Sequence, residues 1–342
     1  MGTKRVLMAM VVVAVALATG CVFEVEDLGG EYSVATDINN HGVLVGFAEP
    51  LDDEPGVQTL HAFKRLPDGT VVDLGSEFST ASDINDSGFV VGTSLGERGT
   101  EAVRWDPSGA MTDVGVPGAD SRAYAINEAG VIVGDAYIAG RQTAYVFDPA
   151  VGHGVPLPLP PGLSDYSAAL RISEAGKAVG RVGETAVMWD LETGTVTDLM
   201  GWTGLHRVQD ITDSGALLGT DATGLVLVQP GSGDRIRVLD GEDGLPLQLG
   251  FASMNEDLTV VGWISSPPER TRAFRWSPES GLAWISTTDP WIEAYAVNDH
   301  DQIVGGSGLA VGEFNAAFLF PDQQPSVVSR PTVSAVVKDA TR

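Results

Sequence analysis

The sequence has few cysteines, few basic residues and few long apolar runs, and each shortage excludes a class of protein. One cysteine among 342 residues excludes an internal disulfide framework and any metal site built from several cysteines. Basic residues number 20 against 46 acidic ones, and the net charge of −26 would repel a phosphate backbone, so we expect no nucleic-acid partner. No stretch after residue 20 keeps an apolar stripe at helical spacing for three turns, so helices are not expected. Hydrophobic residues still make up 43% of the chain, which is enough to form a core.

The one cysteine lies at the end of an N-terminal export signal. Lys4 and Arg5 precede an apolar run over residues 6–17, which is shorter than the roughly 20 residues that a membrane-spanning helix needs. The segment Leu17-Ala18-Thr19-Gly20-Cys21 resembles the bacterial lipoprotein cleavage box. This resemblance implies that residues 1–20 are a signal peptide and that Cys21 carries a lipid that anchors the protein to a membrane. Because the next residue is Val22 and not aspartate, it also implies the outer membrane or cell surface if the cell is Gram-negative. The alternative is an ordinary signal peptide with an incidental cysteine.

One unit is repeated seven times after this signal. Each copy contains Ile-Asn-x-x-Gly-x-x-Val-Gly or a close variant, followed in most copies by Ala-Phe-x-Trp and in several by Thr-Asp-Leu-Gly or relatives of these pieces. The pieces are short, rich in Val, Ile and aromatic residues, and bounded by Gly, Pro, Asn and Asp, which is typical of β-strands. The copies are 39 to 46 residues apart and end at Gly46, Gly92, Gly134, Gly180, Gly219, Gly262 and Gly305.

Four short strands per unit, repeated seven times, predict an all-β, seven-bladed β-propeller of four-stranded blades over residues 21–328. Residues 24–29 match the fourth strand of the other units but have no blade before them, whereas unit seven has no good copy of that strand. We therefore predict that the N-terminal strand closes the last blade and removes an open edge. An open β-solenoid with capping ends is the alternative. Residues 329–342 are expected to form a flexible C-terminal tail.

The three motifs, in this order, resemble the HAF repeat family of extracellular bacterial repeat proteins, and the family's tripeptide occurs as His61-Ala62-Phe63. The resemblance covers residues 24–320 and implies a propeller-like repeat architecture outside the cytoplasm. It implies no established biochemical activity. The sequence departs from the pattern at Ser173 and Thr212, which replace the motif's asparagine, and we expect these two blades to be looser.

The residue after the motif's asparagine is acidic in six of the seven units. A propeller would place these carboxylates in a ring on one face. Two interpretations stay open: a solvated rim, or a weak site for a divalent cation such as calcium. No other cofactor is expected. The six residues are Asp86, Glu128, Glu174, Asp213, Glu256 and Asp299.

The loops between the second and third strands vary in length, and variable loops on a rigid scaffold are where recognition usually resides. The longest belong to units six, seven and one, which are adjacent if the ring closes. Exposed aromatic rings beside carboxylates suit a glycan or a cationic peptide, so we expect a ligand site here. The alternative is that Trp263 and Trp291 fill gaps between blades. The candidate residues are Phe47, Asp52, Asp53, Glu54, Trp263, Glu269, Arg270 and Trp291.

Together these observations favour a monomeric, lipid-anchored propeller, at the cell surface or in the periplasm, that binds or scaffolds a glycan, protein or peptide without catalysis. A lyase or hydrolase acting on polysaccharide in the propeller mouth is the alternative. A structural envelope protein stabilised by a cation is the third hypothesis. No catalytic residue is identified, because the sequence shows no convergent set of unlike polar residues that breaks the repeat.

Overall fold

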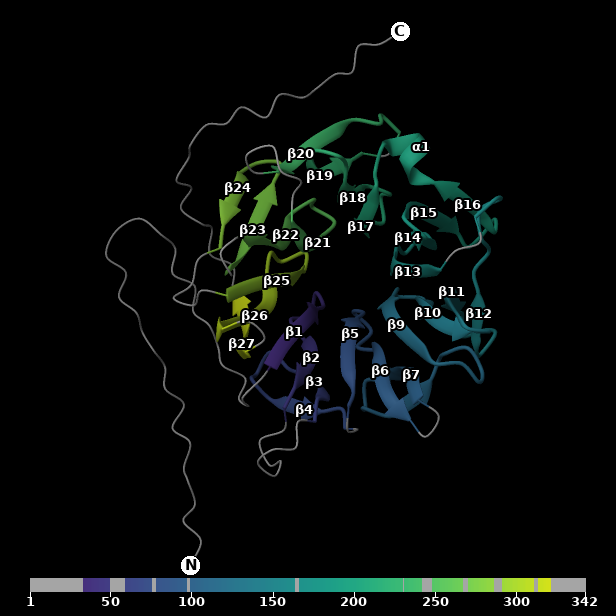
Figure 1. The fold of residues 1–342 in the computed structure, drawn as a ribbon. Coiled ribbons are helices and arrows are strands. Elements are labelled where there is room, and N and C mark those ends of the chain that lie inside the picture. The colour runs from purple at the N-terminus through teal and green to yellow at the C-terminus, as the bar shows by residue number, and fades with distance from the viewer. Residues whose placement is uncertain are drawn as a thin grey trace, which may run out of the picture.

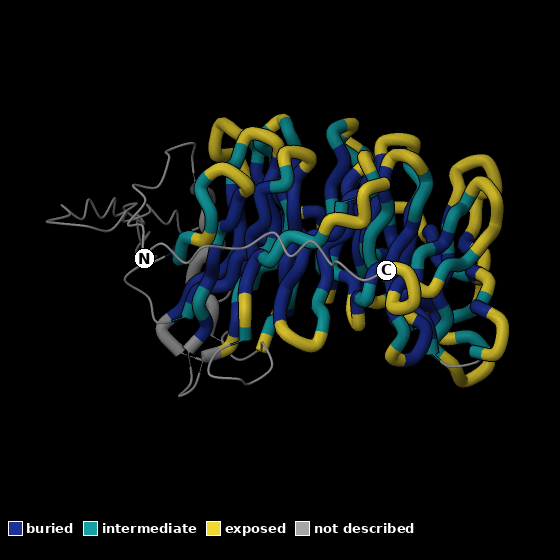
Figure 2. Tube along the Cα trace, turned by 90° about the horizontal axis from the view of Figure 1, so that it is seen from above, coloured by how far each residue is buried: buried dark blue, intermediate teal, exposed yellow. Residues whose placement is uncertain are grey.

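The chain forms a ring of seven antiparallel β-sheets around a central channel, which is a β-propeller (Figure 1). Seen edge-on, the ring is a disc with buried strands in its middle and exposed turns on both faces (Figure 2). We number the sheets as blades 1 to 7 in chain order. The computed structural model describes residues 33–49, 59–75, 78–96, 99–163, 166–229, 231–241, 248–266, 270–285, 291–310 and 313–320.

In blades 1 to 3 the strands follow one another in sequence order from the channel outwards. Blade 1 consists of β1 (Ser33–Ile38), β2 (Leu44–Ala48), β3 (His61–Arg65) and β4 (Val71–Asp73). Blade 2 consists of β5 (Thr80–Ile84), β6 (Val90–Gly96), β7 (Gly99–Trp105) and β8 (Met111–Asp113). Blade 3 consists of β9 (Ser121–Ile126), β10 (Ile132–Ile138), β11 (Arg141–Phe147) and β12 (Gly154–Pro156).

Blades 4 to 6 repeat this order. Blade 4 consists of β13 (Ser167–Ile172), β14 (Lys177–Val182), β15 (Thr185–Asp190) and β16 (Thr195–Asp198). Blade 5 consists of β17 (Arg207–Ile211), β18 (Leu217–Thr220), β19 (Gly224–Val228) and β20 (Arg235–Asp240). Blade 6 consists of β21 (Leu249–Met254), β22 (Val260–Ser266), β23 (Arg270–Ser277) and β24 (Gly281–Trp284).

Blade 7 differs, because it has three strands in the described part of the chain: β25 (Trp291–Val297), β26 (Ile303–Ala310) and β27 (Glu313–Phe320). The prediction of seven four-stranded blades is therefore wrong: among the described residues, six sheets have four strands and the seventh has three. Pro321 and Pro325 follow β27 in the sequence, and proline cannot donate a hydrogen bond to a neighbouring strand. The predicted closing strand at residues 24–29, the signal peptide and the tail lie outside the described residues.

The described part also contains one helix that the sequence did not predict. Helix α1 (Leu199–Thr203) connects blade 4 to blade 5, and the carboxylate of Asp198 caps it by accepting the amides of Met200 and Gly201. With five residues it is too short to show an apolar stripe. No helix in the described part is long and apolar enough to cross a membrane.

The repeated asparagine builds the turn between the first two strands of a blade. In blade 1 the Asn39 Oδ1 atom accepts the amides of His41 (3.1 Å) and Val43 (3.0 Å), and Gly42 takes the left-handed conformation with φ 72°. Blades 6 and 7 replace that glycine with Leu258 and Asp301, which have φ values of 63° and 57°. The turn geometry is thus kept even where the favourable residue is absent.

The glycine that ends each motif is explained by a β-bulge in the inner strand. In blade 1 the pairing shifts register between Ala35 and Asp37, which pushes the inner-strand backbone towards the second strand. A Cβ atom at Gly46 would lie 1.9 Å from the carbonyl oxygen of Val34, and one at Gly134 would lie 1.9 Å from that of Arg122. Only glycine fits at this close approach.

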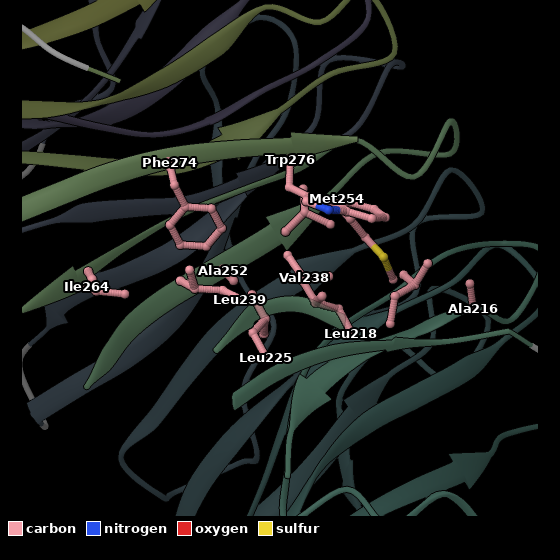
Figure 3. Packing of buried hydrophobic residues seen from close by; sticks show 12 residues of the cluster. Ala216, Leu218, Leu225, Val238, Leu239, Ala252, Met254, Ile264, Phe274 and Trp276 are labelled. Atoms are coloured by element: carbon pink, nitrogen blue, oxygen red, sulfur yellow. The ribbon is translucent and has the colours of Figure 1, made fainter. Parts of the chain in front are cut away.

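Apolar side chains between neighbouring blades form the core. Figure 3 shows one such cluster, in which Phe274, Trp276 and Met254 of blade 6 face Leu218 and Leu225 of blade 5. Each buried side chain of this size contributes about 1.5–3 kcal/mol relative to exposure. Because the clusters lie between sheets, the blades stabilise one another.

The ring closes between blades 7 and 1. Ala35 and Ile38 of blade 1 share a buried cluster with Ala296 and Val304 of blade 7. The Asn298 side-chain amide donates to the Asn39 carbonyl at 2.9 Å. These contacts exclude the open solenoid.

Candidate functional site in the central channel

The predicted loop site is only partly described. Asp52, Asp53, Glu54 and Glu269 lie outside the described residues, and Arg270 begins β23 with its side chain outside the described part. Phe47 and Trp291 are half-buried, at the end of β2 and the start of β25. They belong to blades 1 and 7, which are neighbours in the closed ring.

Trp263 of β22 has a clear packing role. It packs against the buried cluster between blades 6 and 7, beside Ile285 and Ile292. A Cβ atom at Gly250 would lie 2.1 Å from its indole ring, so the ring rests directly on the backbone of β21. This contact matches the gap-filling interpretation of Trp263.

The six predicted carboxylates form a ring around one end of the channel, and each is a hydrogen-bond acceptor. Each accepts a hydrogen bond from the backbone amide of the corresponding residue in the preceding blade. In the first of these bonds the Asn40 amide donates to Asp86 Oδ1 at 2.7 Å, and in the last the Glu256 amide donates to Asp299 Oδ1 at 3.1 Å. Asn40 takes the seventh place and accepts the amide of Asp299 at 2.9 Å. The ring therefore links all seven blades.

Asn40 also separates two carboxylates, because its amide group donates to Asp86 (3.1 Å) and Asp299 (2.9 Å). Elsewhere in the ring the carboxylates face one another. Burial is the largest cause that raises the pKa of Glu174, and the charges of Asp213 and Glu128 raise it further. Among the described residues, no group of three or more acidic, histidine or cysteine side chains is arranged to hold a metal ion.

A second ring lies next to it and uses the motif's asparagines. The side-chain amides of Asn39, Asn85 and Asn127 each donate to a carbonyl of the next blade, at 3.1, 3.0 and 3.4 Å, and Asn255 and Asn298 do the same. Ser173 and Thr212 keep the turn, since their hydroxyls accept amides four residues on, but they have no amide group to donate across the blade boundary.

The central channel is where the repeat is broken. It encloses a cavity of about 190 Å³ lined by the inner strands of all seven blades. The residue two positions before the asparagine, or before the Ser or Thr that replaces it, faces this cavity. Its type and charge differ between blades, whereas the residue that follows it is apolar in every blade. In chain order these residues are Asp37, Asp83, Ala125, Arg171, Asp210, Ser253 and Ala296.

Asp37 and Asp83 form a carboxyl pair on one side of the channel. Each also accepts a backbone amide of the next blade, from Ile84 at 2.9 Å and Ile126 at 2.8 Å. Burial, the negative charge of Asp83 and a hydrogen bond to it hold the pKa of Asp37 well above its usual range. A positive group entering the channel would therefore meet two carboxyl groups that repel each other when both are ionised.

Arg171 reaches from blade 4 towards blades 5 and 6. Its Nε atom lies 3.8 Å from the Asp210 carboxylate, and its guanidinium carbon lies 5.1 Å from the centre of the Phe251 ring. Burial raises the pKa of Asp210, and the charge of Arg171 opposes that shift. The Arg171 charge is thus already balanced by Asp210, which leaves Asp37 and Asp83 without a positive partner from the channel-facing position.

Two tyrosines at the bulges of inner strands are each paired with a carboxylate, from the second strand in blade 3 and from the same strand in blade 7. Tyr124 donates to Asp135 at 2.8 Å, and burial followed by the charge of Asp135 raises the pKa of Tyr124 to about 12. In blade 7 the Tyr295 hydroxyl donates to Glu293, and burial raises the pKa of Glu293. Tyr295 also lies 5.9 Å from the Phe251 ring, so it extends the Arg171 group across blade 7.

Sequence reasoning missed the channel residues. The signal was present, because Asp, Ala, Arg and Ser occupy one position of the repeat that is followed by an apolar residue in every copy. Alignment of the seven copies by structure shows that this position faces the channel. The sequence could not show which side of the inner strand points inwards, because a bulge changes the alternation.

Comparisons with known proteins support the fold. No protein-family model matches the chain, and no curated protein matches it. A streptogramin B lyase structure is 10% identical, covers 84% of this chain and 95% of its own, and has a TM-score of 0.53. A mitotic checkpoint complex structure (14% identity, 94% and 100% coverage, TM-score 0.56) and YCF48 bound to D1 peptide (12%, 93% and 100%, 0.51) are also similar. At these identities the similarity shows the fold alone.

Proposed function

We propose that this protein is a non-enzymatic binding module whose channel receives a cationic group of a protein or peptide partner. The observation that carries the proposal is the break in the repeat at the channel. Three of the seven channel-facing residues are aspartates, and only one of them is balanced by an arginine. A lysine side chain or an amino terminus would supply the missing positive charge and donate to the Asp37–Asp83 pair.

The size of the cavity favours this over catalysis on a polysaccharide. About 190 Å³ is less than the roughly 300–1,000 Å³ of sites for drug-sized ligands, so the cavity suits one side chain. Similar folds occur in an enzyme and in a peptide-binding protein, since one similar structure is a streptogramin B lyase and another is YCF48 bound to D1 peptide. The choice therefore depends on the channel residues and not on the fold.

The test uses the protein without its signal peptide and a fluorescein-labelled peptide Gly-Gly-Lys-Gly-Gly. We expect binding that Asp37→Asn combined with Asp83→Asn weakens at least tenfold, and that acetylation of the lysine abolishes. Asp106→Asn with Asp148→Asn is the matched control, because it removes the same charge from two exposed turns. Equal loss in the control, unchanged binding in the channel variant, or release of products from polysaccharides would overturn the proposal.

We also propose that residues 1–20 are removed and that a lipid on Cys21 anchors the protein to a membrane, at the outer membrane or cell surface in a Gram-negative cell. The sequence of the cleavage box supports this. Growth with an alkyne fatty acid should label the protein, and Cys21→Ser should abolish the label and move the protein from the membrane to the soluble fraction. Retained label in Cys21→Ser would refute the anchor.

A further inference from the structure

The face opposite the asparagine turns carries exposed apolar side chains on blades 2 and 3. Phe78, Leu95 and Tyr137 are 47%, 53% and 59% exposed. Phe78 lies in the connection that enters blade 2, and Leu95 and Tyr137 lie at the ends of β6 and β10, so all three are on the same face. Three large apolar groups on adjacent blades form a patch that solvent does not favour.

Hydrogen bonds make this patch one continuous surface. The Leu95 amide donates to the Phe78 carbonyl at 3.2 Å, and the Tyr137 amide donates to the Asp120 carbonyl at 2.7 Å. A Cβ atom at Gly99 would lie 2.4 Å from the Asp120 carboxylate, so blade 3 touches the blade 2 hairpin at this point. The loop that carries Tyr137 is thereby fixed against the loop that carries Leu95.

Phe78 is held in a conformation that its side chain disfavours. Its φ of 60° lies in the left-handed region, which is uncommon for a bulky residue. Residues held in such sparsely populated backbone regions cluster at binding and catalytic sites.

Carboxylates surround a recess beside the patch. Glu101, Asp113 and Asp120 line a hollow of about 30 Å³ between blades 2 and 3, which has room for one ammonium group. The hollow contains no basic side chain in its lining. The apolar patch is therefore bordered by negative charge, in a protein whose net charge is −26.

We propose that the surface formed by Phe78, Leu95, Tyr137, Glu101 and Asp120 docks a basic segment of a partner protein. Apolar side chains of the segment cover the three exposed residues, and a lysine enters the recess. Charge complementarity selects this occupant over a second copy of the same acidic chain. The proposal rests on the binding function proposed above, but it uses a surface outside the channel.

The probe is a fluorescein-labelled peptide of 12 residues with three Lys, three Leu or Phe and otherwise Ser and Gly, and its counterpart with Glu in place of Lys. We expect fluorescence anisotropy to show binding of the Lys peptide alone. Leu95→Ser with Tyr137→Ser should weaken it at least tenfold, and Glu101→Gln with Asp120→Asn at least fivefold. Val151→Ser is the control, because Val151 is 50% exposed and belongs to blade 3, as Tyr137 does. Val151 lies on the turn that joins β11 to β12, at the opposite face of the propeller.

Five outcomes would overturn the proposal. Equal loss in Val151→Ser would mean nonspecific attraction, and binding only after deletion of residues 321–342 would mean that the chain's own tail occupies the surface. A dimer in sedimentation that Leu95→Ser dissociates would assign the surface to self-association. If the channel variant loses peptide binding and the surface variants keep it, the proposed function stands and this surface site is refuted. If neither the channel variant nor the surface variants lose peptide binding, the proposed function and the surface site are both refuted.

Discussion

Asn298 makes one of the hydrogen bonds that close the ring between blades 7 and 1, and blade 4 shows which substitution removes this bond alone. The Asn298 Nδ2 atom donates to the Asn39 carbonyl, while Oδ1 accepts the amides of His300 (3.1 Å) and Gln302 (3.0 Å). In blade 4 the corresponding residue is Ser173, whose hydroxyl accepts the Lys177 amide at 3.2 Å. Asn298→Ser should therefore keep the turn and lose the bond to blade 1.

The magnitude follows from what each variant leaves unpaired. In Asn298→Ser the Asn39 carbonyl keeps the Gly42 amide as a partner at 3.0 Å, so only the net value of the lost bond is expected, about 1 kcal/mol of unfolding free energy. In Asn298→Ala the His300 and Gln302 amides also lose their acceptor, which adds about 1–2 kcal/mol. The reverse change, Ser173→Asn, should recover about 1 kcal/mol by adding a donor between blades 4 and 5.

Urea unfolding of the three variants, followed by tryptophan fluorescence and circular dichroism, measures these differences. The reasoning predicts the order Ser173→Asn, wild type, Asn298→Ser, Asn298→Ala from most to least stable. Equal destabilisation by the serine and alanine variants would show that the turn bonds, and not ring closure, carry the effect. No change in either would refute the role of the asparagine ring.

Three further predictions concern backbone conformation and protonation. Ala139→Gly should stabilise the protein by about 0.5–1 kcal/mol in the same assay, because φ of Ala139 is 50°, which glycine adopts more readily than alanine. Ala139 is exposed, so loss of its methyl group removes little packing. Gly134→Ala should prevent folding or lower the melting temperature by more than 10 °C, because the new Cβ atom would lie 1.9 Å from the Arg122 carbonyl oxygen. Gly201→Ala is the control and should not destabilise the protein, because Gly201 lies in helix α1 with open space around its Cβ position. Because the pKa of Asp37 is raised by folding, the folded protein holds a proton that the unfolded chain releases, and wild type loses stability as the pH rises from the ordinary aspartate pKa towards the raised one. Asp37→Asn should therefore raise the melting temperature at pH 7, and the difference from wild type should shrink as the pH falls towards 5.

Each of these has a result that contradicts it. A destabilised Ala139→Gly would show that flexibility in the unfolded chain outweighs relief of the strained φ. A folded Gly134→Ala with an unchanged melting temperature would mean that the bulge can move aside. A constant difference between Asp37→Asn and wild type from pH 7 to 5 would contradict the raised pKa of Asp37 in the folded protein.

The repeated motif was sufficient to predict the ring, because its last glycine is present in all seven copies and its asparagine in five, with Ser173 and Thr212 keeping the turn in the other two. Gly46 and its equivalents report a close approach of two backbones, and Asn39 and its equivalents report a turn. The prediction of seven four-stranded blades was wrong, because blade 7 has three strands among the described residues, and the segment predicted as its fourth strand, residues 24–29, lies outside them. The acidic residues were correctly placed in a ring, but their hydrogen bonds to the amides of the preceding blade depend on spacing between blades, which no single repeat encodes.

The hydrogen-bonded ring runs in one sense, since every amide in it donates to the side chain of the following blade and the last donates to the first. A linear array of repeats frays from its ends, and units can be added or lost there one at a time. A cycle has no terminal unit, so a single broken boundary frees no blade, and two must break before one can leave. Insertion or deletion of one repeat would also change the angle at every boundary at once. The copy number of this protein is therefore fixed by geometry, while substitutions at the seven channel positions remain free to diversify.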